Sequence, residues 1–109
     1  MLEPVLGSRN KERILLYLLS RSDGYAREIA RFFKTDLDPI QKQLDRLEQG
    51  GVLYSRVVGR TRLFGFNPRY PFLPEMRNLL RKALGFYPAE DRVRLVSSRR
   101  RPRRKGKPL

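Results

Sequence analysis

The side chains in this sequence that could do chemistry are mostly arginines. Nineteen of the 25 basic residues are arginine, whose planar guanidinium can make two-pronged contacts with phosphate. Only 11 residues are acidic, so the net charge is +14 and the expected partner is a polyanion. The chain has no cysteine and no histidine. These absences exclude disulfide frameworks, zinc fingers, iron–sulfur sites and Cys–His or Ser–His–Asp catalysis, so we expect no metal and no cofactor.

One arrangement of residues is similar to the catalytic elements of an enzyme. Gly7-Ser8 and the carboxylates of Asp36 and Asp38 resemble the Gly-Ser and Asp-x-Asp elements of minimal nucleotidyltransferases, whose carboxylates hold magnesium. In such enzymes the Gly-Ser turn follows a strand and the carboxylates lie on the next strand. Here each pair precedes a helical pattern, and Asp36 is placed to cap a helix. We therefore expect no enzymatic activity.

The densest basic segment is the end of the chain. Residues 99–109 contain no acidic residue and seven basic ones, which are Arg99, Arg100, Arg101, Arg103, Arg104, Lys105 and Lys107. Such a segment repels itself and cannot bury a core, so we predict a disordered arm. The arm would add non-specific affinity for nucleic acid by releasing counterions, and a solvated tail that aids solubility is the alternative.

Apolar periodicity predicts the elements that must position the other charged residues. Helical spacing marks residues 8–21, 25–33, 37–49 and 73–84, and two extended stretches cover 52–58 and 62–66. Gly59-Arg60-Thr61 joins the two stretches as a tight hairpin turn. In residues 88–96, Val93 and Leu95 alternate with arginines, which is typical of a short strand or a linker. The predicted fold is mainly α, in the α+β class.

This order of elements resembles the winged helix-turn-helix domain of MarR-like and ArsR-like transcriptional regulators, over about residues 6–84. It is also similar to the winged helix that precedes minimal nucleotidyltransferase domains. The resemblance implies three helices, a two-stranded β-hairpin wing and a C-terminal helix, with residues 1–86 as the domain and 87–109 as linker and tail. The motifs that carry it are Arg27-Glu28-Ile29-Ala30, residues 44–53, Gly59-Arg60 and Arg62-Leu63-Phe64.

A winged helix-turn-helix binds DNA with its third helix in the major groove and its wing on the neighbouring backbone or minor groove. Gln41 is suited to an adenine edge, and Lys42 to guanine or phosphate. Asp38 and Asp45 place negative charge on the same face, which favours protein binding as the alternative. The predicted DNA-binding set is Arg27, Arg31, Lys34, Thr35, Leu37, Asp38, Gln41, Lys42, Asp45, Arg46, Arg56, Arg60, Thr61 and Arg62.

The last helical pattern carries an apolar stripe, made of Met76, Leu79, Leu80, Ala83 and Leu84. This stripe either completes the domain's own core or forms a two-fold homodimer interface, and we expect the dimer because the other elements already make a core. No apolar run reaches the roughly 18 residues of a membrane helix. The sequence thus predicts a cytoplasmic, nucleoid-associated regulator that binds double-stranded DNA sequence-specifically. The alternative is a non-enzymatic protein-interaction adaptor or architectural protein, whose basic tail binds nucleic acid non-specifically.

Overall fold

A computed structural model of the chain describes the backbone of residues 1–99 and the side chains of residues 1–96. Apart from the backbone of Arg99, the predicted basic tail at 99–109 lies outside the described residues. The elements, in chain order, are α1 (Glu3–Leu6), α2 (Arg9–Arg21), β1 (Asp23–Tyr25), α3 (Ala26–Phe32), α4 (Leu37–Gln49), β2 (Leu53–Val58), β3 (Thr61–Phe66), α5 (Leu73–Leu84) and α6 (Ala89–Arg99).

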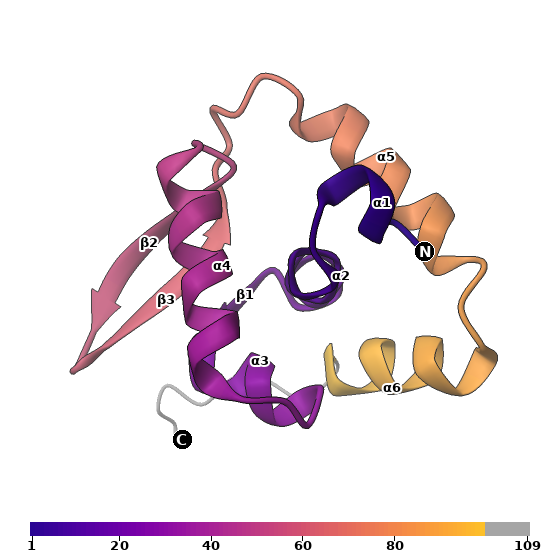
Figure 1. The fold of residues 1–109 in the computed structure, drawn as a ribbon, viewed down its shortest axis with the longest axis horizontal. Helices are drawn as coiled ribbons and strands as arrows, with labels where there is room; N and C mark the ends of the chain where they lie inside the picture. Colours follow the sequence, from indigo (N-terminus) through magenta and orange to yellow (C-terminus); the bar gives the residue numbers. More distant parts are fainter. Residues whose placement is uncertain (100–109) are drawn as a thin grey trace.

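The fold is the winged helix that the sequence predicts, built around α2. In Figure 1, α2 is seen nearly end-on at the centre, with α4 and the sheet on one side and α5 and α6 on the other. The three strands are antiparallel in the order β1-β3-β2, and β2 and β3 form the wing that extends away from the helices. Within residues 1–99, no helix has the length and apolar character needed to cross a membrane.

Local chemistry sets the ends of the main elements. Ser8 caps α2, since its Oγ accepts a hydrogen bond from the Lys11 backbone N–H at 3.2 Å. Asp36 occupies the N-cap position of α4 as predicted, although its side chain makes no capping hydrogen bond. In the turn before α4, Lys34 takes the left-handed φ of 54° that this turn requires. Gly59 has a φ of 63° at the hairpin tip, where glycine carries no Cβ penalty.

The core lies where α2, α4, α5 and the inner face of the sheet meet. The inward face of α4 carries Ile40, Leu44 and Leu47, which are all buried. Phe32 and Phe33, at the end of α3, are partly buried and pack against this core. The exposed side of α4 is therefore fixed by how its apolar side is buried.

Two short elements at the N-terminal side were not predicted. No strand is predicted here, since residues 25–33 carry a helical pattern, but Asp23–Tyr25 form β1, which pairs with β3 and places Tyr25 opposite Leu63. The sheet consequently has three strands rather than two. A single-turn helix, α1, precedes α2, and the buried Leu2 beside it joins the core.

The interpretation of residues 88–96 as a short strand or a linker is wrong, because residues 89–99 form the helix α6. Leu95 is only 3% exposed on its inner side, whereas Val93 is 60% exposed. The Arg94 guanidinium lies 3.9 Å from the centre of the Phe32 ring and donates a hydrogen bond to the Phe32 carbonyl. These contacts hold α6 against the end of α3, so the ordered chain continues well past residue 86.

The apolar stripe of α5 mainly serves the chain's own core. Leu80 and Ala83 are buried, and Met76 and Leu84 are partly buried against the same core. Leu79 alone of the five predicted dimer residues is exposed, at 41%. Most of this stripe is therefore used within one copy of the chain, and the homodimer stays a prediction.

Candidate nucleic-acid interface

A hollow lies where α3, the first half of α4 and the wing converge. It has a volume of about 230 Å³. Six residues of the predicted DNA-binding set line it, one from α3, two from α4 and three from the hairpin: Arg27, Leu37, Gln41, Arg60, Thr61 and Arg62. Residues that are separated by up to 35 positions in the sequence thus form one concave, basic surface.

The hollow also contains residues that the sequence analysis missed. Tyr25, Ala26 and Phe64 complete its lining. Tyr25 is held at the start of α3 by a capping box, in which its backbone N–H donates to Glu28 Oε1 at 3.0 Å. The Tyr-x-x-Glu spacing was the available signal, because Glu three residues after an N-cap marks the start of a helix.

The exposed face of α4 carries one internal hydrogen bond that bears on base recognition. Gln41 Nε2 donates to Asp45 Oδ1 at 3.0 Å, one helical turn away. An amide nitrogen has two hydrogens, so the second remains available, as does the carbonyl oxygen Oε1. The Asp45 carboxylate therefore orients the Gln41 amide, although its negative charge stays on this face.

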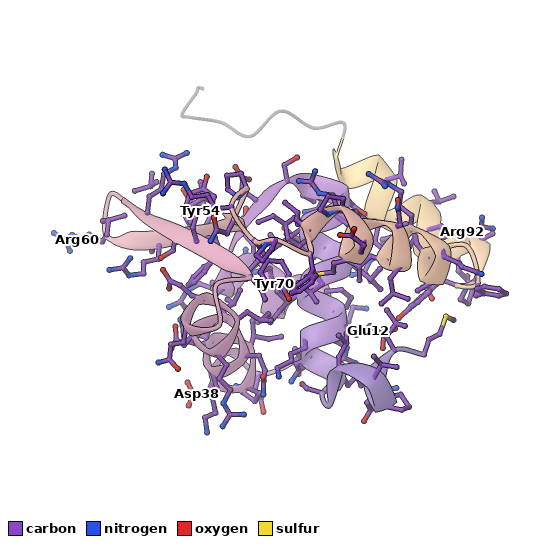
Figure 2. All side chains as sticks on the ribbon, turned by 90° about the horizontal axis from the view of Figure 1, so that it is seen from above. Glu12, Asp38, Tyr54, Arg60, Tyr70 and Arg92 are labelled. Atoms are coloured by element: carbon purple, nitrogen blue, oxygen red, sulfur yellow. The ribbon has the colours of Figure 1, made fainter. Side chains whose placement is uncertain are left out.

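Two arginines of the wing differ in how they are held, because Arg62 is hydrogen-bonded to its neighbours whereas Arg60 is exposed at the tip. Arg62 Nη1 donates to Ser55 Oγ at 3.0 Å, and Ser55 in turn donates to Glu48 Oε2 on α4 at 2.7 Å. This chain of hydrogen bonds ties the middle of the wing to the C-terminal end of α4. Arg60 is exposed at the far tip of the hairpin, as Figure 2 shows. The Thr61 hydroxyl donates to the Val58 carbonyl at 3.2 Å, within the turn itself.

The other predicted residues lie around the hollow rather than in it. Arg31 and Lys34 are exposed on α3 and in the turn after it, and Thr35 is half-buried in that turn. The exposed side of α4 also carries Asp38, Lys42 and Arg46, and Arg56 is exposed on β2. Exposed basic side chains thus lie on α3, in the turn after it, on α4 and on β2.

Two side chains with perturbed pKa values lie away from this surface, Glu12 of α2 and Tyr87 after α5. The Glu12 carboxylate is 2% exposed and accepts hydrogen bonds from the Leu2 backbone N–H at 2.9 Å, the N-terminal amine of Met1 at 3.3 Å and the Tyr87 hydroxyl. Burial by itself raises the pKa of Glu12, but these hydrogen bonds outweigh it and hold the pKa below its usual value. Burial and the neighbouring Glu12 raise the pKa of Tyr87. The cluster joins α1, α2 and the α5–α6 connection, which is a structural role.

Metal binding finds no support in the part of the chain that the structure describes. Residues 1–99 contain no group of three or more acidic, histidine or cysteine side chains placed to hold an ion.

No protein-family model matches this chain, and no curated protein sequence matches it. Solved structures are similar to it in fold. The apo form of a double mutant of Lactococcus lactis ZitR has a TM-score of 0.55 and 17% identity, with 89% of this chain and 81% of that chain covered. The adhesin competence repressor AdcR from Streptococcus pyogenes has a TM-score of 0.51 and 17% identity, with 88% of this chain and 83% of that chain covered. These likenesses show the winged helix fold.

Proposed function

We propose that this chain is a transcriptional regulator that binds double-stranded DNA sequence-specifically. The observation that carries the proposal is the hollow between α3, α4 and the wing, which Arg27, Arg60, Arg62 and Gln41 all line. Arginines that line the same surface as an amide are suited to hold phosphates while the amide meets a base edge. The fold that the chain shares with AdcR, which is named a repressor, supports the same role.

The dimensions of α4 suit the major groove. Its 13 residues span about 20 Å at 1.5 Å per residue, and the groove, about 12 Å wide, admits one helix. With α4 in the groove, Arg60 at the wing tip extends toward the neighbouring backbone or minor groove. Arg27 and Arg31 on α3 then face phosphates on the near strand.

Gln41 is the base-reading residue of this proposal, and Asp45 is its positioning residue. Adenine offers an acceptor at N7 and a donor at N6, which match the second N–H and the Oε1 of a glutamine amide. The hydrogen bond to Asp45 uses only one of the two amide hydrogens, so it orients Gln41 without blocking that pair of contacts. This role accounts for a carboxylate on a face that meets DNA.

The proposal has three further parts. The chain forms a homodimer, it is located in the cytoplasm in association with the nucleoid, and its basic tail has an accessory role. Two copies related by a two-fold axis would read a palindromic site with half-sites about one helical turn apart. The tail would add affinity that falls with salt, since Lys and Arg contacts to phosphate release counterions.

The test is a selection of bound genomic fragments at physiological salt, where non-specific binding is suppressed. The full chain is compared with a chain that ends at Arg99, because an earlier end would remove α6 and its buried Leu95. Enrichment of one palindromic motif by both proteins is the expected result. Enrichment of no motif by either protein would refute sequence-specific binding and leave the protein-interaction adaptor or architectural protein as the better explanation.

A further inference from the structure

The hollow between α3, α4 and the wing is apolar on its inner side, although its outer edge is basic. Phe64 and Ala26 line it from the interior of the protein, since they are only 1% and 8% exposed. Leu37, the first residue of α4, packs against the same core and is partly exposed in the hollow. The exposed part of Leu37 therefore presents an apolar surface among charged side chains.

Leu37 and Gln41 lie on the same face of α4. They are four residues apart, so their side chains are neighbours on the helix surface, about 6 Å apart along its axis. Both side chains line the hollow. Stacked base pairs are about 3.4 Å apart. A helix that lies along the major groove and places Gln41 at one base pair therefore places Leu37 one or two base pairs away.

The chemistry of Leu37 matches one feature of the major groove. Each base pair presents a distinct pattern there, and thymine is the base whose edge carries a methyl group, at C5. Leucine has no hydrogen-bonding group in its side chain. Against the polar edge of another base it would displace water without replacing the lost hydrogen bonds, which is unfavourable. Leu37 is therefore suited to thymine.

The arginines of the hollow bring a base edge within reach of Leu37. Arg27 lines the hollow on the α3 side, whereas Arg60 and Arg62 line it on the wing side. Figure 1 shows the start of α4 between α3 and the tip of the wing. Phosphates that are held on both sides would fix how closely the duplex approaches α4. Leu37 then meets the groove rather than open solvent.

We propose that Leu37 is a specificity-determining residue, which contacts the C5-methyl group of a thymine one or two base pairs from the adenine that Gln41 contacts. This inference rests on the proposed function and adds a second base to the half-site. A contact between Leu37 and a deoxyribose would also be apolar, but it would not depend on the sequence. The experiment separates these two contacts.

The experiment measures the affinity of the full chain for the duplex that the genomic selection enriches, with its thymines replaced one at a time by deoxyuridine. Deoxyuridine lacks the methyl group but keeps the hydrogen-bonding edge of thymine. One replacement in each half-site should weaken binding about fourfold, because one methyl-sized group is no longer buried. This position should lie one or two base pairs from the position at which Gln41→Ala relaxes the preference for adenine. An affinity that no replacement changes would overturn the proposal.

Variants of the protein test whether Leu37 makes the contact. Leu37→Ala should abolish the difference in affinity between the thymine and deoxyuridine duplexes, whereas Leu37→Met keeps an apolar side chain of similar volume and should keep most of it. Val5→Ala shortens an apolar side chain that is 73% exposed on α1 and does not line the hollow, so the difference should stay about fourfold. Partial unfolding of a variant lowers both affinities equally and leaves their ratio unchanged. A fourfold ratio that persists in Leu37→Ala would overturn the assignment to Leu37.

A second pair of duplexes tests the methyl group apart from thymine. The thymine is replaced by cytosine, which has no methyl group, or by 5-methylcytosine, which restores the methyl group at the same ring carbon. The parent protein should bind the 5-methylcytosine duplex about fourfold more tightly than the cytosine duplex, and Leu37→Ala should bind both equally. Equal binding of both by the parent protein would overturn the methyl contact. If one duplex is enriched but no methyl effect is found, this inference fails and the proposed function stands. If no duplex is enriched, both fail.

Discussion

The arginines that line the α4 hollow allow a quantitative prediction of how DNA affinity depends on salt concentration. Arg27, Arg60 and Arg62 line one concave surface, and Arg62 is held there through Ser55 by Glu48. If each contacts one phosphate, replacing all three by glutamine removes three counterion-releasing contacts. We expect the triple variant to bind its preferred duplex more weakly, with a shallower dependence on salt.

The size of the effect follows from counterion release. Each phosphate contact contributes about 0.9 to the slope of log affinity against log salt, so three contacts contribute about 2.7. Between about 50 and 200 mM salt, the affinity of the parent protein should therefore fall about 40-fold more than that of the variant. Fluorescence anisotropy with a labelled duplex at four or five salt concentrations measures both slopes.

The matched control removes the same charge from elsewhere. Arg69→Gln, Lys82→Gln and Arg92→Gln change three exposed cations that do not line the hollow, and Figure 2 shows Arg92 at the opposite end of the molecule from Arg60. In this control, the slope of log affinity against log salt should differ from that of the parent protein by no more than about 0.9, the contribution of one phosphate contact. If the salt dependence of affinity became equally shallow in both triple variants, binding would depend on net charge alone. The hollow would then not be the interface.

Three further changes test other parts of the structure. Asp45→Ala frees the Gln41 amide, so it should reduce discrimination between duplexes with adenine and guanine at one position by about 1 kcal/mol, whereas Asp45→Asn keeps the acceptor and should keep the preference. Unchanged discrimination in the alanine variant would show that Asp45 positions nothing. Leu79→Asp should halve the mass measured by light scattering without lowering the melting temperature, because Leu79 is exposed while Leu80 is buried, and an unchanged mass would remove Leu79 from any dimer contact. Glu12 has a folded-state pKa below 4.5, so its contribution to stability is present above that pH and is lost as the pH falls through the folded-state value. Urea unfolding from pH 7 to pH 3 should show a flatter acid limb for Glu12→Gln than for the parent protein, and parallel curves would contradict this role.

The elements that the sequence predicts well are those whose signal is local. The helices α2, α4 and α5 bury apolar side chains at helical spacing. The two strands of the wing are rich in β-branched and aromatic residues, and Gly59 lies at the tip between them. The strand β1 escapes such reasoning because its three residues carry no pattern of their own. It exists because Tyr25 and its neighbours pair with β3, about 40 residues later in the chain.

The helix α6 shows how an alternating pattern misleads. Val93 and Leu95 alternate with arginines, which suggests a strand with one apolar face. Two residues apart on a helix, however, side chains point about 200° from each other, given 3.6 residues per turn. The structure agrees, since Leu95 is buried and Val93 is exposed. The contact that settles the conformation is tertiary, because Arg94 stacks on Phe32 of α3.

The candidate interface is predictable from the sequence only in part. Arginines at the helix starts and the hairpin tip identify Arg27, Arg60 and Arg62, since the fold resemblance places them. The function of Asp45 was not predictable, because its charge reads as unfavourable until its hydrogen bond to Gln41 is known.

The burial of α5 changes which surface is available for a homodimer. Leu80 and Ala83 are used within one copy, so an interface must use apolar side chains that remain exposed. The large ones in the C-terminal part of the described chain include Leu79, Phe86 and Val93, on α5, the α5–α6 connection and α6. Residues 37–49, which form α4, expose no large apolar side chain. A dimer that buries the α5–α6 surface would therefore leave both α4 hollows open to one DNA duplex, whereas a dimer through α4 would bury charge and close them.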